Sequence, residues 1–168
     1  KKFRLNLEKK FKIDEFKSLF TFYYSGFNVR STDLNASLGI EQLKKIRKIS
    51  LIRQMNYNRY KKNLSTFWCQ KSNLKILSSF GYATFVKNRL DVFKYLRKKK
   101  IQSRPLICGN MAQQPFLKNK FKNKINLNNA KFVDKYGIYL PNHANLSKGD
   151  IDYISEQFLK IAKPIFFN

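Results

Sequence analysis

The chain has 168 residues, of which 43% are apolar and 15% aromatic. That share of apolar side chains is enough for one hydrophobic core, which excludes a disordered tail. Lys and Arg total 35 against 10 Asp and Glu, so the formal net charge is +25. The charge excludes an acidic scaffold and indicates an anionic partner such as a nucleic acid, although a surface composition biased toward Lys and Asn explains it equally well.

The strongest helix signal lies at residues 31–63. Ser31 or Thr32 can cap the helix, and Asp33 places a carboxylate in its first turn. Apolar residues then recur mostly three or four positions apart, with Lys and Arg filling much of the remainder. A helix of this length in a small domain connects two bodies or lies along an interface.

Strands and shorter helices follow. Residues 80–86 are aromatic and β-branched and predict a strand, whereas residues 89–100 predict an amphipathic helix that ends in three lysines. Residues 101–107 predict another strand, in which Pro105 indicates an edge or an end.

The C-terminal part predicts a short helix at 130–136, a strand at 138–141 and a last helix capped by Ser147, with Asp150 three positions later. The order of elements predicts an α+β fold, in which a long helix precedes a sheet of about three strands with helices packed on it.

Residues able to carry chemistry are few. There is no phosphate-binding loop of the P-loop or dinucleotide type. The single His143 and the two cysteines, Cys69 and Cys108, have the spacing of neither a zinc site nor a disulfide framework, so we expect no metal and reduced thiols. No apolar run approaches the ~18 residues of a membrane span, and we expect no signal peptide, no membrane partner and a cytoplasmic location.

Two segments are candidates for binding. Residues 26–33 form a turn that leads into a helix start, where free backbone N–H groups, Asn28 and Arg30 can hold an anion; an ordinary capped helix explains them as well. Residues 103–115, which include Arg104 and Asn110, read as a strand that runs into a polar loop, either a binding loop or a plain connection.

Taken in chain order, these segments resemble the C-terminal part of the DegT/DnrJ/StrS family of PLP-dependent sugar aminotransferases, which have fold type I. The matching stretches are GFNVRSTDLNA at residues 26–36, GIEQL at 39–43 and LPNHANLS at 140–147. The stretch KKIQSR at 99–104 also matches but lacks the glycine that precedes Ile in the family pattern. RPLICGN at 104–110 is similar to the branch that holds the keto-sugar 3-dehydratases and the Kdo-type aminotransferases.

The resemblance implies the small α+β domain of a homodimeric enzyme that shares each active site between two subunits. Asn28 would contact the phosphate of pyridoxal 5'-phosphate (PLP) in the partner subunit, and Arg30 would face an anionic part of the substrate. Arg104 and Asn110 would face the sugar or its anionic group, and His143 would lie near the mouth of the site. The implied reaction moves an amino group from an amino acid, glutamate, to a keto sugar or nucleotide sugar in surface polysaccharide or lipopolysaccharide biosynthesis; 3-dehydration of the keto sugar is the alternative.

The family's Schiff-base lysine and the acid that pairs with the PLP ring belong to a large N-terminal domain. We therefore expect residues 1–30 to be a remnant of that domain and its linker, 31–64 the connecting helix and 65–168 the small domain. We assign no catalytic residue and expect a fragment that is inactive alone. Two other hypotheses remain: a basic nucleic-acid-binding module, and a stand-alone structural or regulatory module that dimerises through the long helix.

Overall fold

The computed structural model describes residues 2–12, 23, 31–106, 109–110, 112 and 127–167. The chain forms two compact units, Lys1–Ile40 and Glu41–Asn168. The first unit contains helix α1 (Lys2–Lys10), in which Arg4 Nε donates a hydrogen bond to Glu8 Oε1 at 3.0 Å, one turn along the helix.

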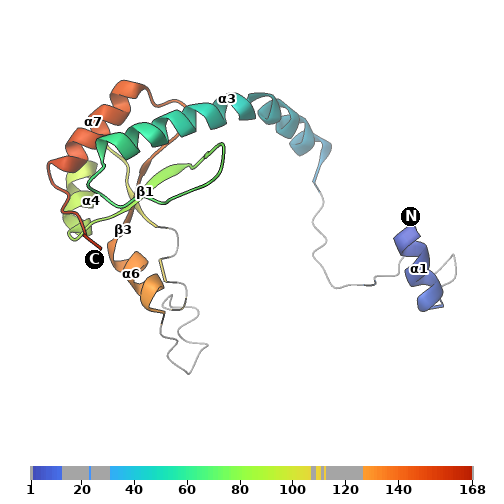
Figure 1. Ribbon diagram of the computed structural model, residues 1–168. Coiled ribbons are helices and arrows are strands. Elements are labelled where there is room, and N and C mark those ends of the chain that lie inside the picture. Colours follow the sequence, from blue (N-terminus) through green and yellow to red (C-terminus); the bar gives the residue numbers. More distant parts are fainter. Residues whose placement is uncertain are drawn as a thin grey trace. The chain divides into compact units, whose positions relative to one another are not determined.

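Helix α3 (Asp33–Asn63) is the long helix of Figure 1. The hydroxyl of Thr32 accepts a hydrogen bond from the backbone N–H of Asn35 at 3.3 Å, so Thr32 caps the helix. Near the other end, Tyr57 and Tyr60 are buried. The predicted long helix is confirmed, and its C-terminal turns contribute to the core.

Among the described residues the strands form one antiparallel sheet (Figure 1). It contains β1 (Gly81–Phe85), β2 (Arg104–Pro105) and β3 (Gly137–Pro141) in the spatial order β1-β3-β2. The prediction of a strand over 101–107 is wrong in length. Strand β2 ends at a proline, which has no backbone N–H to donate to a neighbouring strand.

The two faces of the sheet have different surroundings, because successive side chains of a strand point to opposite faces. Tyr82 of β1 and Ile138 and Leu140 of β3 are buried and belong to the core. Tyr139 lies between the two β3 core residues and therefore points to the opposite face, where it is half-buried. This alternation places Tyr139 next to the candidate site.

The described residues of the second unit also form α4 (Arg89–Lys98), α6 (Asn128–Tyr136) and α7 (Lys148–Leu159). Helices α4 and α7 lie side by side, and the hydroxyl of Tyr95 donates a hydrogen bond to Gln157 Oε1 at 3.0 Å. All three helices were predicted from the sequence, each with small differences at its ends.

The start of α7 has the capping box that the sequence predicts. Ser147 Oγ accepts from the backbone N–H of Asp150 at 3.1 Å, and Asp150 Oδ2 accepts from the backbone N–H of Ser147 at 2.8 Å. Hydrogen bonds from the Ser147 side chain and backbone lower the pKa of the Asp150 carboxyl.

The core is a single cluster in which three helices, the segment after α3 and two strands meet. Its buried members are Tyr57, Tyr60, Leu64, Phe67, Tyr82, Val86, Val92, Leu96, Ile101, Ile138, Leu140, Ile151, Ile154 and Phe158. Helices on a small antiparallel sheet make an α+β fold, as predicted.

Candidate functional site

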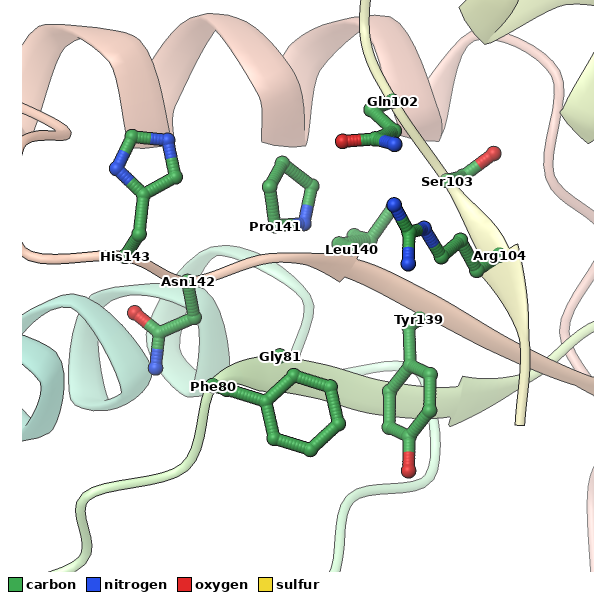
Figure 2. Close-up of a pocket in the computed structure, with 10 residues that line it drawn as sticks. All are labelled: Phe80, Gly81, Gln102, Ser103, Arg104, Tyr139, Leu140, Pro141, Asn142 and His143. Carbon is green, nitrogen blue, oxygen red and sulfur yellow. The ribbon is translucent and has the colours of Figure 1, made fainter. Parts of the chain in front are cut away.

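A pocket of about 150 Å³ lies where β3 ends and the chain passes into the turn before α7 (Figure 2). Because β3 lies between β1 and β2, the ends of all three strands contribute to its wall. Its lining residues are Phe80, Gly81, Gln102, Ser103, Arg104, Tyr139, Leu140, Pro141, Asn142 and His143.

Arg104 supplies the positive charge of the pocket. It lies on the edge strand β2 and pairs in register with Tyr139. The side-chain oxygen of Gln102, with its amide oriented toward the guanidinium, accepts from Arg104 Nη2 at 2.8 Å and from Nε at 3.3 Å. A guanidinium has five N–H donors, so this contact fixes its direction and leaves donors for a ligand.

His143 stands on a fixed backbone. Asn56 Nδ2 donates to the carbonyl oxygens of His143 and Leu146, each at 3.4 Å, and the hydroxyl of Tyr60 donates to the carbonyl of Pro141 at 2.9 Å. The imidazole itself is exposed. Helix α3 therefore fixes the backbone of the turn that carries His143, while the imidazole remains accessible at the pocket (Figure 2).

Asn142, the next residue toward β3, is completely buried and reinforces the same turn. Its Nδ2 donates to the carbonyl of Ser79 at 2.9 Å and to the carbonyl of Arg53 at 3.1 Å. These bonds connect the turn to α3 and to the residues before β1. The turn is thus tied on two sides, which suits a binding site that must keep its shape.

Two aromatic rings give the pocket an apolar wall. Phe80 and Tyr139 have ring centroids 5.3 Å apart, and the Phe80 side chain is 56% exposed. Ligand pockets generally combine such apolar walls with a few fixed polar groups. The arrangement suits a ligand with both an apolar face and an anionic or hydroxyl group, as a sugar derivative has.

The structure brings two of the predicted site residues together, since Arg104 and His143 line the same pocket. Asn110 does not line it: its side chain is 1% exposed, and neither amide atom has a hydrogen-bond partner within the part of the chain that the structure describes. Asn28 and Arg30 lie outside the described residues, so their contacts stay predictions.

Three lining residues, Gln102, Phe80 and Tyr139, were not predicted from the sequence. Gln102 lies two positions from Arg104, a spacing that puts side chains on the same side of an extended segment. Phe80 and Tyr139 carry no such signal, because they meet only when β1 and β3 pair.

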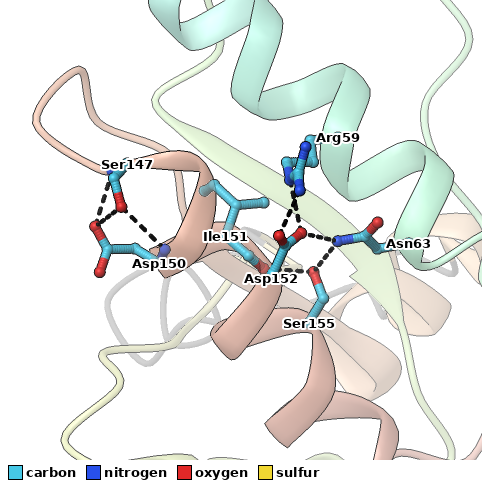
Figure 3. A network of polar contacts seen from close by, with 7 residues as sticks. All are labelled: Arg59, Asn63, Ser147, Asp150, Ile151, Asp152 and Ser155. Carbon is cyan, nitrogen blue, oxygen red and sulfur yellow. Dashed lines mark hydrogen bonds and ion pairs between the residues drawn. The ribbon is translucent and has the colours of Figure 1, made fainter.

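A polar network connects α3 to α7 (Figure 3). Arg59 makes a bidentate contact with Asp152, with Nε to Oδ1 at 2.6 Å, and Asn63 Nδ2 donates to the same Oδ1 at 2.8 Å. These hydrogen bonds, from Arg59 first and Asn63 second, lower the pKa of Asp152 to about 2. The network fixes α7 against the helix that also holds the His143 turn.

The described residues include no group of three metal-binding side chains, and none of their helices is long and apolar enough to cross a membrane. Every lysine side chain that the structure describes is exposed.

The fold and the pocket define an α+β unit in which an arginine and a histidine line one pocket beside an aromatic wall. The sequence profile of the DegT/DnrJ/EryC1/StrS aminotransferase family matches residues 6–159, and the chain belongs to that family. It is 29% identical over 168 residues to a GDP-4-keto-6-deoxy-D-mannose 3-dehydratase of Escherichia coli O55:H7, covering 90% of this chain and 43% of that protein. It is 31% identical over 145 residues to the Yersinia pseudotuberculosis enzyme of the same name, covering 78% of this chain and 36% of that protein.

A solved GDP-4-keto-6-deoxymannose-3-dehydratase with a trapped PLP-glutamate geminal diamine has the same fold, with a TM-score of 0.72 and 27% identity. The match covers 87% of this chain and 40% of that one. The chain thus spans less than half the length of the relatives it matches. The fold is confirmed as that of part of a fold-type I PLP enzyme.

Proposed function

We propose that this chain forms the substrate-facing C-terminal part of a PLP-dependent enzyme that removes the 3-hydroxyl of a nucleotide-linked keto sugar. The observation that carries the proposal is the pocket that Arg104 and His143 both line, together with the Phe80–Tyr139 wall. The guanidinium offers charge-assisted hydrogen bonds to an anionic group or a sugar hydroxyl, and the aromatic rings offer a surface for the sugar ring.

The preference for dehydration over transamination comes from the relatives, because both proteins described above are 3-dehydratases. Transamination from glutamate is the second candidate, since the matched family carries the aminotransferase description. Either reaction belongs to the biosynthesis of deoxy or amino sugars, which we place in surface polysaccharide or lipopolysaccharide assembly.

Bound PLP supplies an electron sink for bond breaking in the substrate, and the residues of this chain bind and orient that substrate. We infer that Asn28 contacts the PLP phosphate of the partner subunit and that Arg30 faces an anionic part of the substrate. The enzyme would then act as a homodimer with glutamate as amino-acid donor. Arg104 would hold the substrate from the edge strand, and His143 would contact it at the mouth of the pocket.

The two reactions differ in where the glutamate nitrogen goes. In transamination it is found on the sugar, and glutamate becomes 2-oxoglutarate. In 3-dehydration glutamate is also oxidised to 2-oxoglutarate, but the nitrogen leaves as ammonia, while the sugar keeps its ketone and loses the 3-hydroxyl as water. The two electrons released by glutamate balance the deoxygenation of the sugar.

The test supplies nitrogen-labelled glutamate, PLP and a GDP-linked 4-keto-6-deoxy sugar to the protein as it occurs in its source cells. We expect labelled ammonia and a sugar product that lacks one oxygen, as measured by mass spectrometry. Labelled nitrogen on the sugar would contradict dehydration and identify the reaction as transamination. An unchanged sugar, together with unchanged glutamate, would contradict both reactions.

The role of the pocket is tested by Arg104→Gln, which keeps hydrogen-bonding ability but removes the charge. We expect a higher KM for the keto sugar and unchanged folding, because Arg104 is exposed.

The chain purified alone with PLP should show no turnover of the keto sugar, since its described lysines are all exposed. Robust turnover by the isolated chain would overturn that expectation.

A further inference from the structure

A second hollow adjoins the pocket, and residues 102–104 line both. It has a volume of about 460 Å³ and lies between the end of α4 and strand β2. Arg97, Lys100 and Arg104 line it, whereas no acidic residue does. We refer to Arg97, Lys100, Ser103 and Arg104 together as the cationic hollow.

The three cations of the hollow are not neutralised by the described residues. Within the described residues, no carboxylate forms an ion pair with any of them, and the polar partner of Arg104 is the neutral amide of Gln102. Like charges gathered on one surface repel one another. An anion bound between them would remove that repulsion and form charge-assisted hydrogen bonds.

Lys100 occupies a strained backbone position at the hollow. The N–H of Ile101 donates to the carbonyl of Leu96 at 2.9 Å, and the N–H of Lys100 donates to the carbonyl of Arg97 at 3.0 Å. This pair of bonds is the Schellman motif that ends many helices, and its left-handed position favours glycine. Lys100 has a φ of +58° there, at the place where the family pattern has glycine. A lysine destabilises the turn but adds an ammonium group to the hollow.

Ser103 provides an independent sign of a ligand. Its side chain is 6% exposed and lines both the pocket and the hollow. The hydroxyl makes no hydrogen bond with any part of the chain that the structure describes. A buried hydroxyl without a partner is unfavourable, and a phosphate oxygen in the hollow would accept its hydrogen bond.

We propose that the cationic hollow binds a phosphate-type anion and that, in the enzyme, this anion is the diphosphate of the nucleotide-linked sugar. The second half of the proposal rests on the proposed function. Residues 102–104 would then contact both parts of the substrate, with the sugar in the pocket and the diphosphate in the hollow. Arginine suits this role because its planar fork matches two phosphate oxygens.

The first test measures binding of inorganic diphosphate to the full chain by calorimetry at fixed ionic strength. Arg97→Gln is compared with Lys98→Gln, the adjacent residue of the same helix, which loses the same charge but does not line the hollow. We expect Arg97→Gln to weaken binding about tenfold, as one charge-assisted hydrogen bond suggests. Lys98→Gln should change it less than about twofold, as expected for a screened exposed charge. Equal losses in the two variants would overturn the proposal, because the general charge of the protein would then explain binding.

Two further variants separate ligand binding from folding. Lys100→Gly should raise the melting temperature by relieving the left-handed strain, yet weaken diphosphate binding. Ser103→Ala should leave the melting temperature unchanged or higher and also weaken binding. A purely structural role for either residue predicts no loss of binding, and that result would count against the site.

The last test uses the holoenzyme with its GDP-linked keto sugar. We expect Arg97→Gln to raise KM with little change in kcat, and Lys98→Gln to change neither. If no keto sugar is turned over but diphosphate binding still depends on Arg97, the proposed function fails and the anion site stands. If the enzyme is active but the two variants bind diphosphate equally, the anion site fails and the proposed function stands.

Discussion

The two halves of α3 have similar apolar periodicity but opposite surroundings. In the N-terminal half, Leu38, Leu43 and Ile46 are 59%, 64% and 55% exposed. In the C-terminal half, Tyr57 and Tyr60 are 6% and 0% exposed and stack against the ring of Tyr82 or tilt toward it. The described residues therefore bury Tyr57 and Tyr60 in the C-terminal half of α3 and leave the apolar side chains of its N-terminal half exposed.

The difference shows what apolar periodicity can and cannot predict. Apolar residues that recur every three or four positions indicate that one face of a helix will be buried. They do not indicate which part of the protein will cover that face. The C-terminal half packs against β1 and donates hydrogen bonds to the end of β3 and to the turn after it. An extended apolar face such as that of the N-terminal half is typical of a surface that contacts another protein surface.

The largest effect that we predict compares Tyr60→Ala with Leu43→Ala. Tyr60 is fully buried and its hydroxyl donates to the carbonyl of Pro141, so its truncation should lower the free energy of unfolding by about 3–5 kcal/mol. Leu43 is 64% exposed, so the same change there should cost less than about 0.5 kcal/mol. Urea unfolding of both variants measures the difference.

Tyr60→Phe serves as the control for this pair, since it keeps the ring and removes only the hydrogen bond. We expect it to cost about 1 kcal/mol. A loss at Leu43 as large as that at Tyr60 would contradict the comparison, because the N-terminal half of α3 would then be packed within the chain itself.

The second prediction concerns the contact between α3 and the pocket. Asn142→Ala removes two hydrogen bonds and leaves the carbonyls of Arg53 and Ser79 without this donor. Because the side chain is completely buried, we expect a loss of about 2–3 kcal/mol in the free energy of unfolding. Asn145→Ala, at an exposed position of the same turn, is the matched control and should have little effect. Similar losses in both variants would mean that the turn, and not the buried amide, determines the stability.

Local signals predicted most of the fold. The cap at Thr32 and the capping box of Ser147 and Asp150 involve residues close in sequence, so the starts of α3 and α7 could be read directly. The strand over 101–107 was overestimated, because its length depends on pairing with β3 and not on local preference. Pro105 indicated correctly where the pairing ends.

The site was less predictable than the fold. Arg104 was proposed from the strand-to-loop pattern and from the family resemblance, and His143 from the resemblance, whereas Phe80 and Tyr139 were not proposed. Their contact depends on the register that places Gly81 opposite Pro141, which no local pattern contains. The resemblance also placed Asn110 in the site; it is buried and is not among the residues that line the pocket, so its role stays a prediction.

The smallest predicted effect is on the pH dependence of stability, through the network that joins the packed half of α3 to α7. The pKa of Asp152 is lowered from 3.8 to about 2, first by the hydrogen bond from Arg59 and then by the one from Asn63. A lowered folded-state pKa stabilises the protein above the unfolded pKa, and this stabilisation is lost as the pH falls from about 4 to about 2.

Asp152→Asn should therefore lower the melting temperature slightly at neutral pH and flatten the decline of stability between pH 4 and 2, the interval between the two pKa values. The side chains of Arg59 and Asp152 are 39% and 45% exposed, so the difference in melting temperature should be smaller still in high salt. Thermal unfolding of both proteins across this pH range measures it, with Asp91→Asn as a control that removes an exposed carboxylate of α4. An equally steep decline in Asp152→Asn and the unmodified chain would show that the contact between Arg59 and Asp152 does not contribute to stability. The packed half of α3 would then be held by its buried tyrosines and amides alone.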